Sequence, residues 1–239
     1  MRDPPGRRST VNLLAFDTST EALSVAVAGR GVCLAHAGEG GAKASATLIP
    51  TALALLQQAG LALGELDAIV FGSGPGSFTG LRTACSVAQG LALGAGVPVL
   101  PVETLMAVAD DARERTGARD VLALLDARMD EVYLARYTHD GRRWHRDGPV
   151  RLAAPEAVAA PAGIVLAGNV FRGYGERLAG GAARIEAMPT AAALLRLAPA
   201  LLADGEGRPA DQALPLYVRD KVAQTTAERA AARQDRIAP

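Results

Sequence analysis

A glycine-rich turn at residues 72–80 separates a short apolar run from a long segment of small and apolar residues. The apolar run, residues 68–71, is typical of a buried strand, and residues 79–95 are typical of a helix. Glycines in such a turn let backbone N–H groups approach a ligand or another chain at the N-terminus of the helix. The sequence therefore predicts an α/β unit with this turn as its candidate binding loop.

The turn lacks the residues of the two common phosphate-binding loops. A P-loop ends in Gly-Lys-Ser/Thr, whereas Gly80 is followed by Leu81 and Arg82. A dinucleotide-binding loop has the spacing Gly-x-Gly-x-x-Gly, whereas Gly74, Gly76 and Gly80 give Gly-x-Gly-x-x-x-Gly. The turn thus has the shape of a phosphate loop without its chemistry.

The order of predicted elements indicates two α/β units. The first has three hairpin-linked strands followed by helix, strand, helix and strand, at 11–16, 23–28, 32–37, 47–59, 68–71, 79–95 and 97–102. The second has a helix, two strands around a charged turn, a strand and a helix, at 104–115, 120–125, 132–137, 164–167 and 190–202. Residues 140–149, which hold the only Trp, predict an exposed turn. We expect a disordered leader, an N-terminal lobe, a C-terminal lobe and a flexible or frayed helical tail, at 1–10, 11–103, 104–222 and 223–239.

The ten-residue run from Ser73 to Arg82, Ser-Gly-Pro-Gly-Ser-Phe-Thr-Gly-Leu-Arg, resembles the signature of the TsaB (YeaZ-like) family. Residues 15–20, 126–133 and 215–221 resemble further segments of that family in the same order. The resemblance implies a two-lobed actin-like ATPase fold of ribonuclease H-like units, with mixed sheets flanked by helices.

The same resemblance implies a non-catalytic role in tRNA modification. Members of the family are scaffold subunits required to form threonylcarbamoyladenosine (t6A) at adenosine 37 of tRNAs that read ANN codons. The implied partners are a TsaD-like catalytic subunit, which the chain would bind and activate through its first lobe, and a TsaE-like ATPase. A homodimer is implied for the chain alone, and tRNA would be reached only through the complex.

Charge and composition exclude several other classes. The 25 basic and 25 acidic residues cancel, whereas a stand-alone nucleic-acid binder usually carries a basic excess. Cys33 and Cys85 are far apart in apolar settings, which favours buried free thiols over a disulfide or a metal pair. No signal-peptide pattern and no uninterrupted membrane-spanning run occurs, so we expect a cytoplasmic protein without a membrane partner.

Asp17 and Thr18, together with Gly74 and Gly76, are the candidates for binding a nucleotide cofactor. By resemblance to actin-like ATPases, an Asp at the end of the first strand would orient a metal-bound nucleotide. The alternative is that Asp17 and Thr18 cap a tight hairpin, and we favour it because no phosphate-loop Lys and no set of metal-binding carboxylates accompanies them. A vestigial site, no cofactor, no catalytic residue and no metal are therefore expected.

Two other enzyme classes are weighed against the scaffold. An ATP-dependent small-molecule kinase of the same superfold is the main alternative, with Asp17 and the turn holding nucleotide. A metallopeptidase would need a His-x-x-x-His pair on the first helix, and residues 43–48 contain no His.

The two helices of the first unit are apolar on more than one side. A helix that covers one face of a sheet needs a single apolar stripe, so a second stripe predicts a protein interface. Tight packing onto the sheet alone is the alternative. Arg82 lies in the first helical turn, where a cation is unfavourable beside the helix dipole, which suggests a specific partner such as a carboxylate. The alternative is a solvated Arg whose stem lies along the helix. The predicted interface residues are Leu48, Ala52, Leu55, Gly80, Arg82, Ala84, Ala88 and Ala92.

Overall fold

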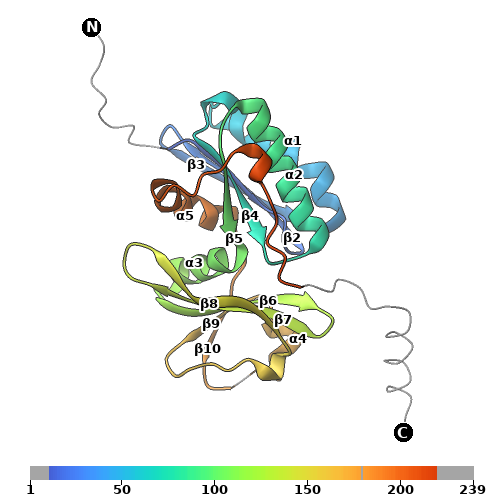
Figure 1. Cartoon of the computed structure of the whole chain (residues 1–239), viewed down its shortest axis with the longest axis vertical. Helices are drawn as coiled ribbons and strands as arrows, with labels where there is room; N and C mark the ends of the chain where they lie inside the picture. Colours follow the sequence, from blue (N-terminus) through green and yellow to red (C-terminus); the bar gives the residue numbers. More distant parts are fainter. Residues whose placement is uncertain (1–10, 179, 220–239) are drawn as a thin grey trace.

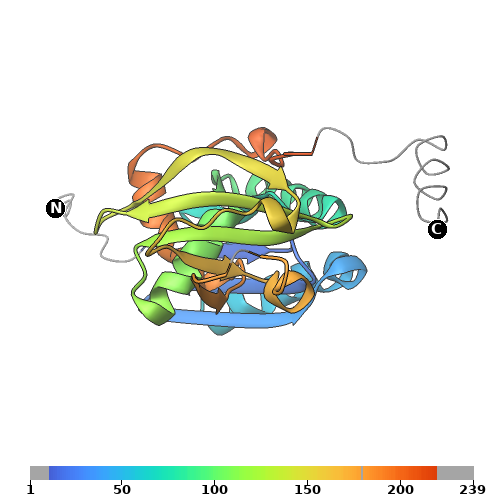
Figure 2. The same ribbon diagram turned by 90° about the horizontal axis from the view of Figure 1, so that it is seen from below.

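The computed structural model describes residues 11–178 and 180–219. Its two five-stranded sheets are stacked as layers (Figures 1 and 2). The first sheet has the order β3-β2-β1-β4-β5, with strands Leu13–Asp17 (β1), Ala22–Gly29 (β2), Val32–Glu39 (β3), Ala68–Gly74 (β4) and Val99–Glu103 (β5). The second has the order β10-β9-β6-β7-β8, with strands Asp120–Arg128 (β6), Glu131–His139 (β7), Trp144–Ala153 (β8), Val165–Gly168 (β9) and Ala183–Glu186 (β10).

Both sheets follow one strand plan. In each, the first three strands are antiparallel hairpins, and the next two strands run parallel to the first. The hairpin order, with strands alternating with helices, confirms the mixed α/β architecture that the sequence predicts.

Helices cover the first sheet on both faces. Its outer face packs on α1 (Ala44–Gln58) and α2 (Phe78–Ala95) through one apolar core. Its inner face shares a second core with α3 (Thr104–Thr116), α5 (Ala191–Ala203) and the second sheet, so these two helices lie between the layers (Figure 1). A third core covers the far face of the second sheet, beside the short α4 (Phe171–Tyr174).

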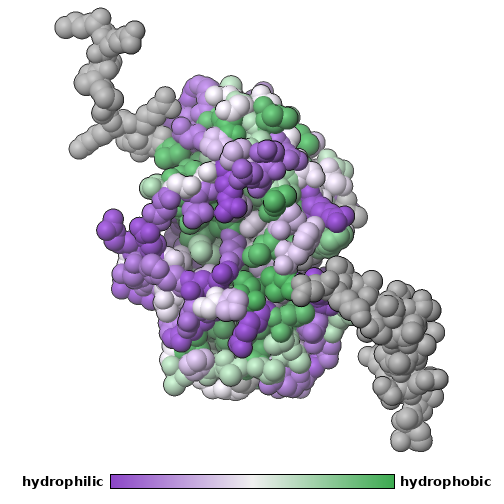
Figure 3. Space-filling view, viewed as in Figure 1, coloured by the Kyte–Doolittle hydropathy of each residue, from purple (hydrophilic) through white to green (hydrophobic). Residues whose placement is uncertain are grey.

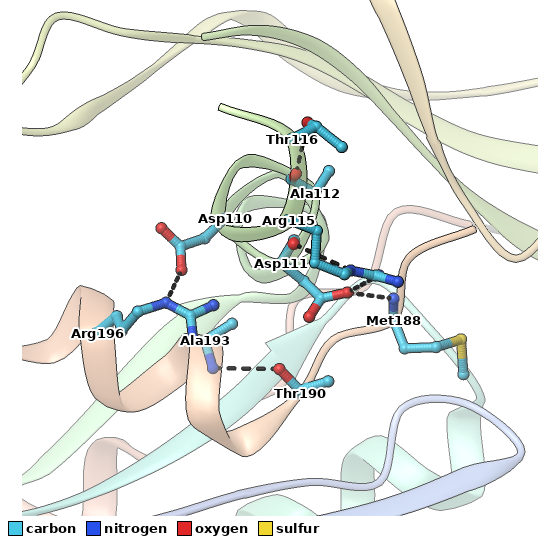
Figure 4. Close-up of polar contacts among 9 residues, drawn as sticks. All are labelled: Asp110, Asp111, Ala112, Arg115, Thr116, Met188, Thr190, Ala193 and Arg196. Carbon is cyan, nitrogen blue, oxygen red and sulfur yellow. Dashed lines mark hydrogen bonds and ion pairs between the residues drawn. The ribbon is translucent and has the colours of Figure 1, made fainter. Parts of the chain in front are cut away.

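Helix α5 belongs by sequence to the range 104–222 but packs on the first sheet. The backbone N of Ala191 donates to Ser24 Oγ on β2 at 2.8 Å. Arg196 Nε donates to Asp110 Oδ2 on α3 at 2.7 Å (Figure 4). After α5 the chain returns along the first lobe and ends, in the described part, at the junction of the two layers (Figure 1). Helix α5 thus packs with the first sheet, although it lies in the range predicted for the C-terminal lobe.

Two local predictions are wrong. Residues 140–149 are not an exposed turn throughout, because β8 begins at Trp144. The Trp144 ring is buried between the layers and its Nε1 donates to Asp110 Oδ1 at 3.2 Å. Cys85 is a buried free thiol as predicted, whereas the free thiol of Cys33 is exposed because β3 is an edge strand with little cover.

The predicted leader (1–10) and tail (223–239) lie outside the described residues. No helix of the described part has the length and apolarity needed to cross a membrane.

Candidate functional site at the junction of the lobes

The four sequence segments that resemble the TsaB family meet in space. The glycine-rich turn between β4 and α2 contacts the β1–β2 turn on one side. It contacts the chain segment 214–219 on another. That segment in turn contacts the β6–β7 turn. The candidate site is therefore built from both lobes.

The β1–β2 turn packs directly on the glycine-rich turn. Thr18 Oγ1 donates to the carbonyl of Gly80 at 2.7 Å, and the backbone N of Ser77 donates to the carbonyl of Ser19 at 2.7 Å. A Cβ on Gly76 would lie 2.5 Å from Ser19 O, and one on Gly80 would collide with Thr18 O. Glycine is needed at both places because two stretches of backbone touch there.

Backbone donors of the glycine-rich turn are already engaged within the chain. The N–H of Gly74, which has a φ of 120° that favours glycine, donates to Thr104 Oγ1 at 3.0 Å. The N–H of Leu81 donates to Ser77 O at 2.8 Å, and the Ser77 side chain accepts from Gly80 N as the N-cap of α2. These N–H groups thus hold the turn and start the helix.

Asp17 is buried beside this contact, with 1% of its surface exposed. Its Oδ1 accepts from the backbone N and the hydroxyl of Ser19, at 2.8 and 2.7 Å. Its Oδ2 has no hydrogen-bond partner in the described part of the chain and lies against the Cα of Gly72. Burial raises the pKa of the carboxyl to about 6, more than the Ser19 hydrogen bonds lower it. The geometry is that of a hairpin cap.

Segment 214–219 forms a strap from the first lobe to the second. The backbone N of Leu216 donates to Ser73 O at 2.7 Å. The Tyr217 ring stacks on the Phe78 ring at a centroid distance of 5.5 Å. Arg82 Nε donates to the Tyr217 hydroxyl at 3.1 Å, and its guanidinium lies 3.8 Å from the Phe78 centroid. Arg82 therefore has specific partners within its own chain, and they are aromatic rings.

Arg219 ends the strap by clamping the β6–β7 turn. Its guanidinium donates to Glu131 Oε2 at 2.6 Å and to the carbonyl of Ala127 at 3.2 Å, and it contacts Met129 Sδ at 2.8 Å. Residues 128–130 have φ values of 61°, 55° and 64°, a left-handed backbone conformation that residues other than glycine rarely adopt. Such strain persists only where surrounding contacts hold it.

A cavity of about 190 Å³ lies between the strap, the glycine-rich turn and the β6–β7 turn. We call it the junction cavity. Met129 and Tyr217 at its mouth are 53% and 48% exposed. Its walls are Gly76, Phe78, Leu81, Ala127, Arg128, Met129, Tyr133, Leu216, Tyr217, Val218 and Arg219.

The predicted interface residues do not form a surface. Seven of the eight are buried on the inner faces of α1 and α2 and so belong to the core of the chain. These seven are Leu48, Ala52, Leu55, Gly80, Ala84, Ala88 and Ala92. Arg82 alone of the predicted set is exposed. The exposed large apolar side chains of these helices are others: Leu53 at 47%, Leu93 at 76%, Ile49, and Phe78 at the start of α2. These seven residues pack within the chain, whereas the second apolar stripe of α1 is partly exposed at Ile49 and Leu53.

The nucleotide candidates Asp17, Thr18, Gly74 and Gly76 lie on the two turns that contact each other. Gly76 lies against Ser19, whereas Gly74 lies against Leu216 and Leu81. The sequence did not identify Phe78, Met129, Tyr217 and Arg219 as site residues. All four lie within or beside the quoted segments, so the segments themselves were the signal. In the described ranges, no group of three or more His, Cys, Asp or Glu side chains is placed to hold a metal ion.

Comparison with known proteins gives one consistent result. The family model described as "TsaD: tRNA N6-adenosine threonylcarbamoyltransferase" matches residues 39–191. The solved structure of YeaZ from Pseudomonas aeruginosa aligns with a TM-score of 0.81 and 43% identity, over 87% of this chain and 100% of that one. The chain belongs to the TsaB (YeaZ-like) family.

Two curated TsaB-family proteins are similar in sequence. Both are named tRNA threonylcarbamoyladenosine biosynthesis protein TsaB. The one from Escherichia coli (strain K12) is 42% identical over 149 residues, 62% of this chain and 64% of that protein. The one from Haemophilus influenzae is 44% identical over 131 residues, 54% of this chain and 55% of that protein. The match thus spans less than two thirds of either relative. The family assignment confirms the two-lobed actin-like, ribonuclease H-like fold that the resemblance implies.

Proposed function

We propose that this chain is a non-catalytic scaffold subunit of a complex that forms t6A at adenosine 37 of tRNAs reading ANN codons. Its relatives are named for threonylcarbamoyladenosine biosynthesis, which supports the pathway. The observation that carries the non-catalytic role is the direct contact between the β1–β2 turn and the glycine-rich turn. The Ser77 N–H meets Ser19 O, and Thr18 Oγ1 meets Gly80 O, where an ATPase of this fold would place phosphates between two turns.

The kinase alternative is less well supported by the same contacts. A nucleotide would have to separate the two turns and break both hydrogen bonds, and it would then face Asp17, whose carboxyl favours the neutral form more than usual. The proposal is therefore a protein without a nucleotide cofactor.

The catalytic TsaD-like subunit is proposed to bind the outer face of α1 and α2. Ile49, Leu53 and Leu93 expose apolar surface there. In water, exposed apolar helix faces associate because their burial removes about 25 cal/mol per Å² of unfavourable hydration. The same face would pair two copies when the chain is alone. The TsaE-like ATPase and tRNA would join through the complex, in the cytoplasm.

Reconstitution tests this function. Unmodified tRNA is incubated with the TsaD-like and TsaE-like subunits, ATP and threonylcarbamoyl-adenylate, which donates the threonylcarbamoyl group and releases AMP. The reaction is run with or without this chain, and t6A is measured by mass spectrometry. We expect t6A only when the chain is present, with Leu53→Glu reducing the yield. The exposed control Gln58→Glu, which lies on another side of α1, should leave it unchanged. Equal t6A without the chain, or ATP turnover by the isolated chain that Asp17→Ala abolishes, would overturn the scaffold role.

A further inference from the structure

We propose that the surface around the junction cavity is a second protein-docking site, which takes a segment carrying an apolar or aromatic side chain flanked by carboxylates. The proposal rests on the proposed function, since it adds a partner surface to the same scaffold. Its α2 residues, Phe78 and Arg82, come from the first turns of that helix, whereas Leu93 lies in the last turn. The residues that carry it are Phe78, Arg82, Arg128, Met129, Leu216 and Tyr217, which we call the junction surface.

The junction surface gathers apolar groups that a monomer would be expected to bury. Phe78, Met129, Leu216 and Tyr217 are all exposed, and they come from three separate parts of the chain. Figure 3 shows apolar surface at the junction of the lobes, next to the place where the described chain ends. Contiguous apolar surface with a cavity at its centre is typical of a protein-binding site, where one anchor side chain fills the pocket.

The surface is held ready for a partner. Stacking fixes Tyr217 on Phe78, and Arg219 fixes the β6–β7 turn, whose three left-handed residues would otherwise relax. Strained residues that surrounding contacts keep in place are a feature of binding sites. A preorganised surface loses less conformational entropy on binding, so more of the contact energy appears as affinity.

The two arginines of the junction surface indicate the charge that a partner segment would carry. Arg82 forms no ion pair with a carboxylate of the described residues, and its Nε meets only the Tyr217 hydroxyl. The Arg128 side chain is 76% exposed and meets Asp126 at 3.1 Å on one side. Two guanidiniums therefore border the cavity with donors facing solvent, which complements carboxylates on an incoming segment.

A protein partner fits these features better than RNA. RNA binding draws most of its affinity from several phosphate contacts, and this chain has equal numbers of basic and acidic residues. The apolar wall side chains of the cavity include Leu81, Val218 and Met129, which suit an apolar side chain. Tyr and Arg together are enriched at the centres of protein interfaces.

Photo-crosslinking in the reconstituted t6A system tests the proposal. The photoreactive residue p-benzoylphenylalanine is placed at position 129, and crosslinked peptides are mapped by mass spectrometry. We expect a crosslink to an acidic segment with an apolar residue in a different protein of the mixture. Arg82→Glu and Arg128→Glu should each lower its yield on the order of tenfold, because a like charge then faces the carboxylates. The control Arg208→Glu, an exposed arginine paired with Glu206 elsewhere, should not.

Crosslinks to tRNA, to this chain or to a second copy only, or no crosslink, would overturn the proposal, as would a yield unaffected by both charge reversals. The t6A yield of the wild-type chain is measured alongside. If the wild type fails to support t6A, the proposed function itself fails. If it supports t6A and the crosslink is absent, only the docking site fails.

Discussion

Asp17 and Asp126 stand at the same point of two sheets that share one strand plan. Each Oδ1 accepts a hydrogen bond at 2.8 Å from the backbone N two residues further on, Ser19 N in the first lobe and Arg128 N in the second. Their surroundings differ. Asp17 is buried with a partnerless Oδ2, whereas Asp126 also meets the Tyr174 hydroxyl and the Arg128 guanidinium. The β1–β2 turn packs on the glycine-rich turn, whereas the β6–β7 turn lies at the junction surface.

The burial of Asp17 predicts a pH-dependent stability. Its pKa is about 6 in the folded chain and 3.8 without the fold, so the native state holds the proton more tightly than the unfolded state. Stability should then fall as pH rises from about 4 to about 6 and stay lower above that, by about 3 kcal/mol in total. Urea unfolding of the wild type and of Asp17→Asn across this range checks it. Asp17→Asn should lose this fall, and the exposed-site control Asp211→Asn should keep it. A wild type whose stability rises through this range, with the same slope in Asp17→Asn, would contradict the burial argument.

Gly80 and Gly90 form a matched pair within α2. A Cβ at position 80 would collide with Thr18 O, whereas at position 90 nothing lies within 4 Å. Gly80→Ala should lower the free energy of unfolding by about 1–3 kcal/mol because backbone must move apart. Gly90→Ala should raise it by about 1 kcal/mol through helix propensity. Chemical denaturation of both variants measures the difference, and equal effects would show that the two turns are not in contact.

Ala88 and Leu93 form a second matched pair within α2. Ala88 is buried against the first sheet, and Leu93 is 76% exposed on the outer side of the same helix. Ala88→Arg should destabilise the fold by several kcal/mol, about 3 or more, because a charge enters the core. Leu93→Arg should leave the melting temperature unchanged and weaken binding to the TsaD-like subunit. Calorimetry and titration separate the two, and a fold that tolerates Ala88→Arg would return the small-residue stripe to the surface.

Loss of the Arg219 guanidinium should increase the local dynamics of the β6–β7 turn. Without its guanidinium, the left-handed residues 128–130 lose the contacts that hold them. In Arg219→Gln, hydrogen exchange of the amides at 129–131 should therefore accelerate on the order of tenfold. Arg219→Lys should restore it only in part, since one ammonium cannot reach the several acceptors of a planar guanidinium. Unchanged protection in Arg219→Gln, with Arg208→Gln as the control, would show that the turn holds itself.

The order of strands and helices from β1 to β7 was predictable because each of these elements carries its own period and its own end signals. The glycine-rich turn is an example, with Ser77 capping α2 and Gly96 ending it in the left-handed region. A local sequence pattern does not show which other element of the fold an apolar stripe packs against. The stripe of Ala84, Ala88 and Ala92 indicates burial, but only the fold shows that the sheet buries it.

Long-range contacts were beyond prediction for the same reason. Arg219 and Glu131 are 88 positions apart, and no residue between them indicates that they meet. Trp144 was misplaced because its charged neighbours suggest a turn, while its own ring is buried at the start of β8. The junction cavity lies where the glycine-rich turn, the strap and the β6–β7 turn meet through long-range contacts, so the sequence alone did not show it.

The central claim is that Asp17 and the glycine-rich turn hold the scaffold together and perform no chemistry. The most direct measurement is the t6A yield of the reconstituted system with Asp17→Asn in place of the wild type. Asparagine keeps the acceptor that Ser19 needs and removes the ionisable group. We predict a yield equal to that of the wild type. A folded Asp17→Asn chain that supports t6A about a hundredfold more slowly, the scale of a lost catalytic carboxylate, would contradict the account.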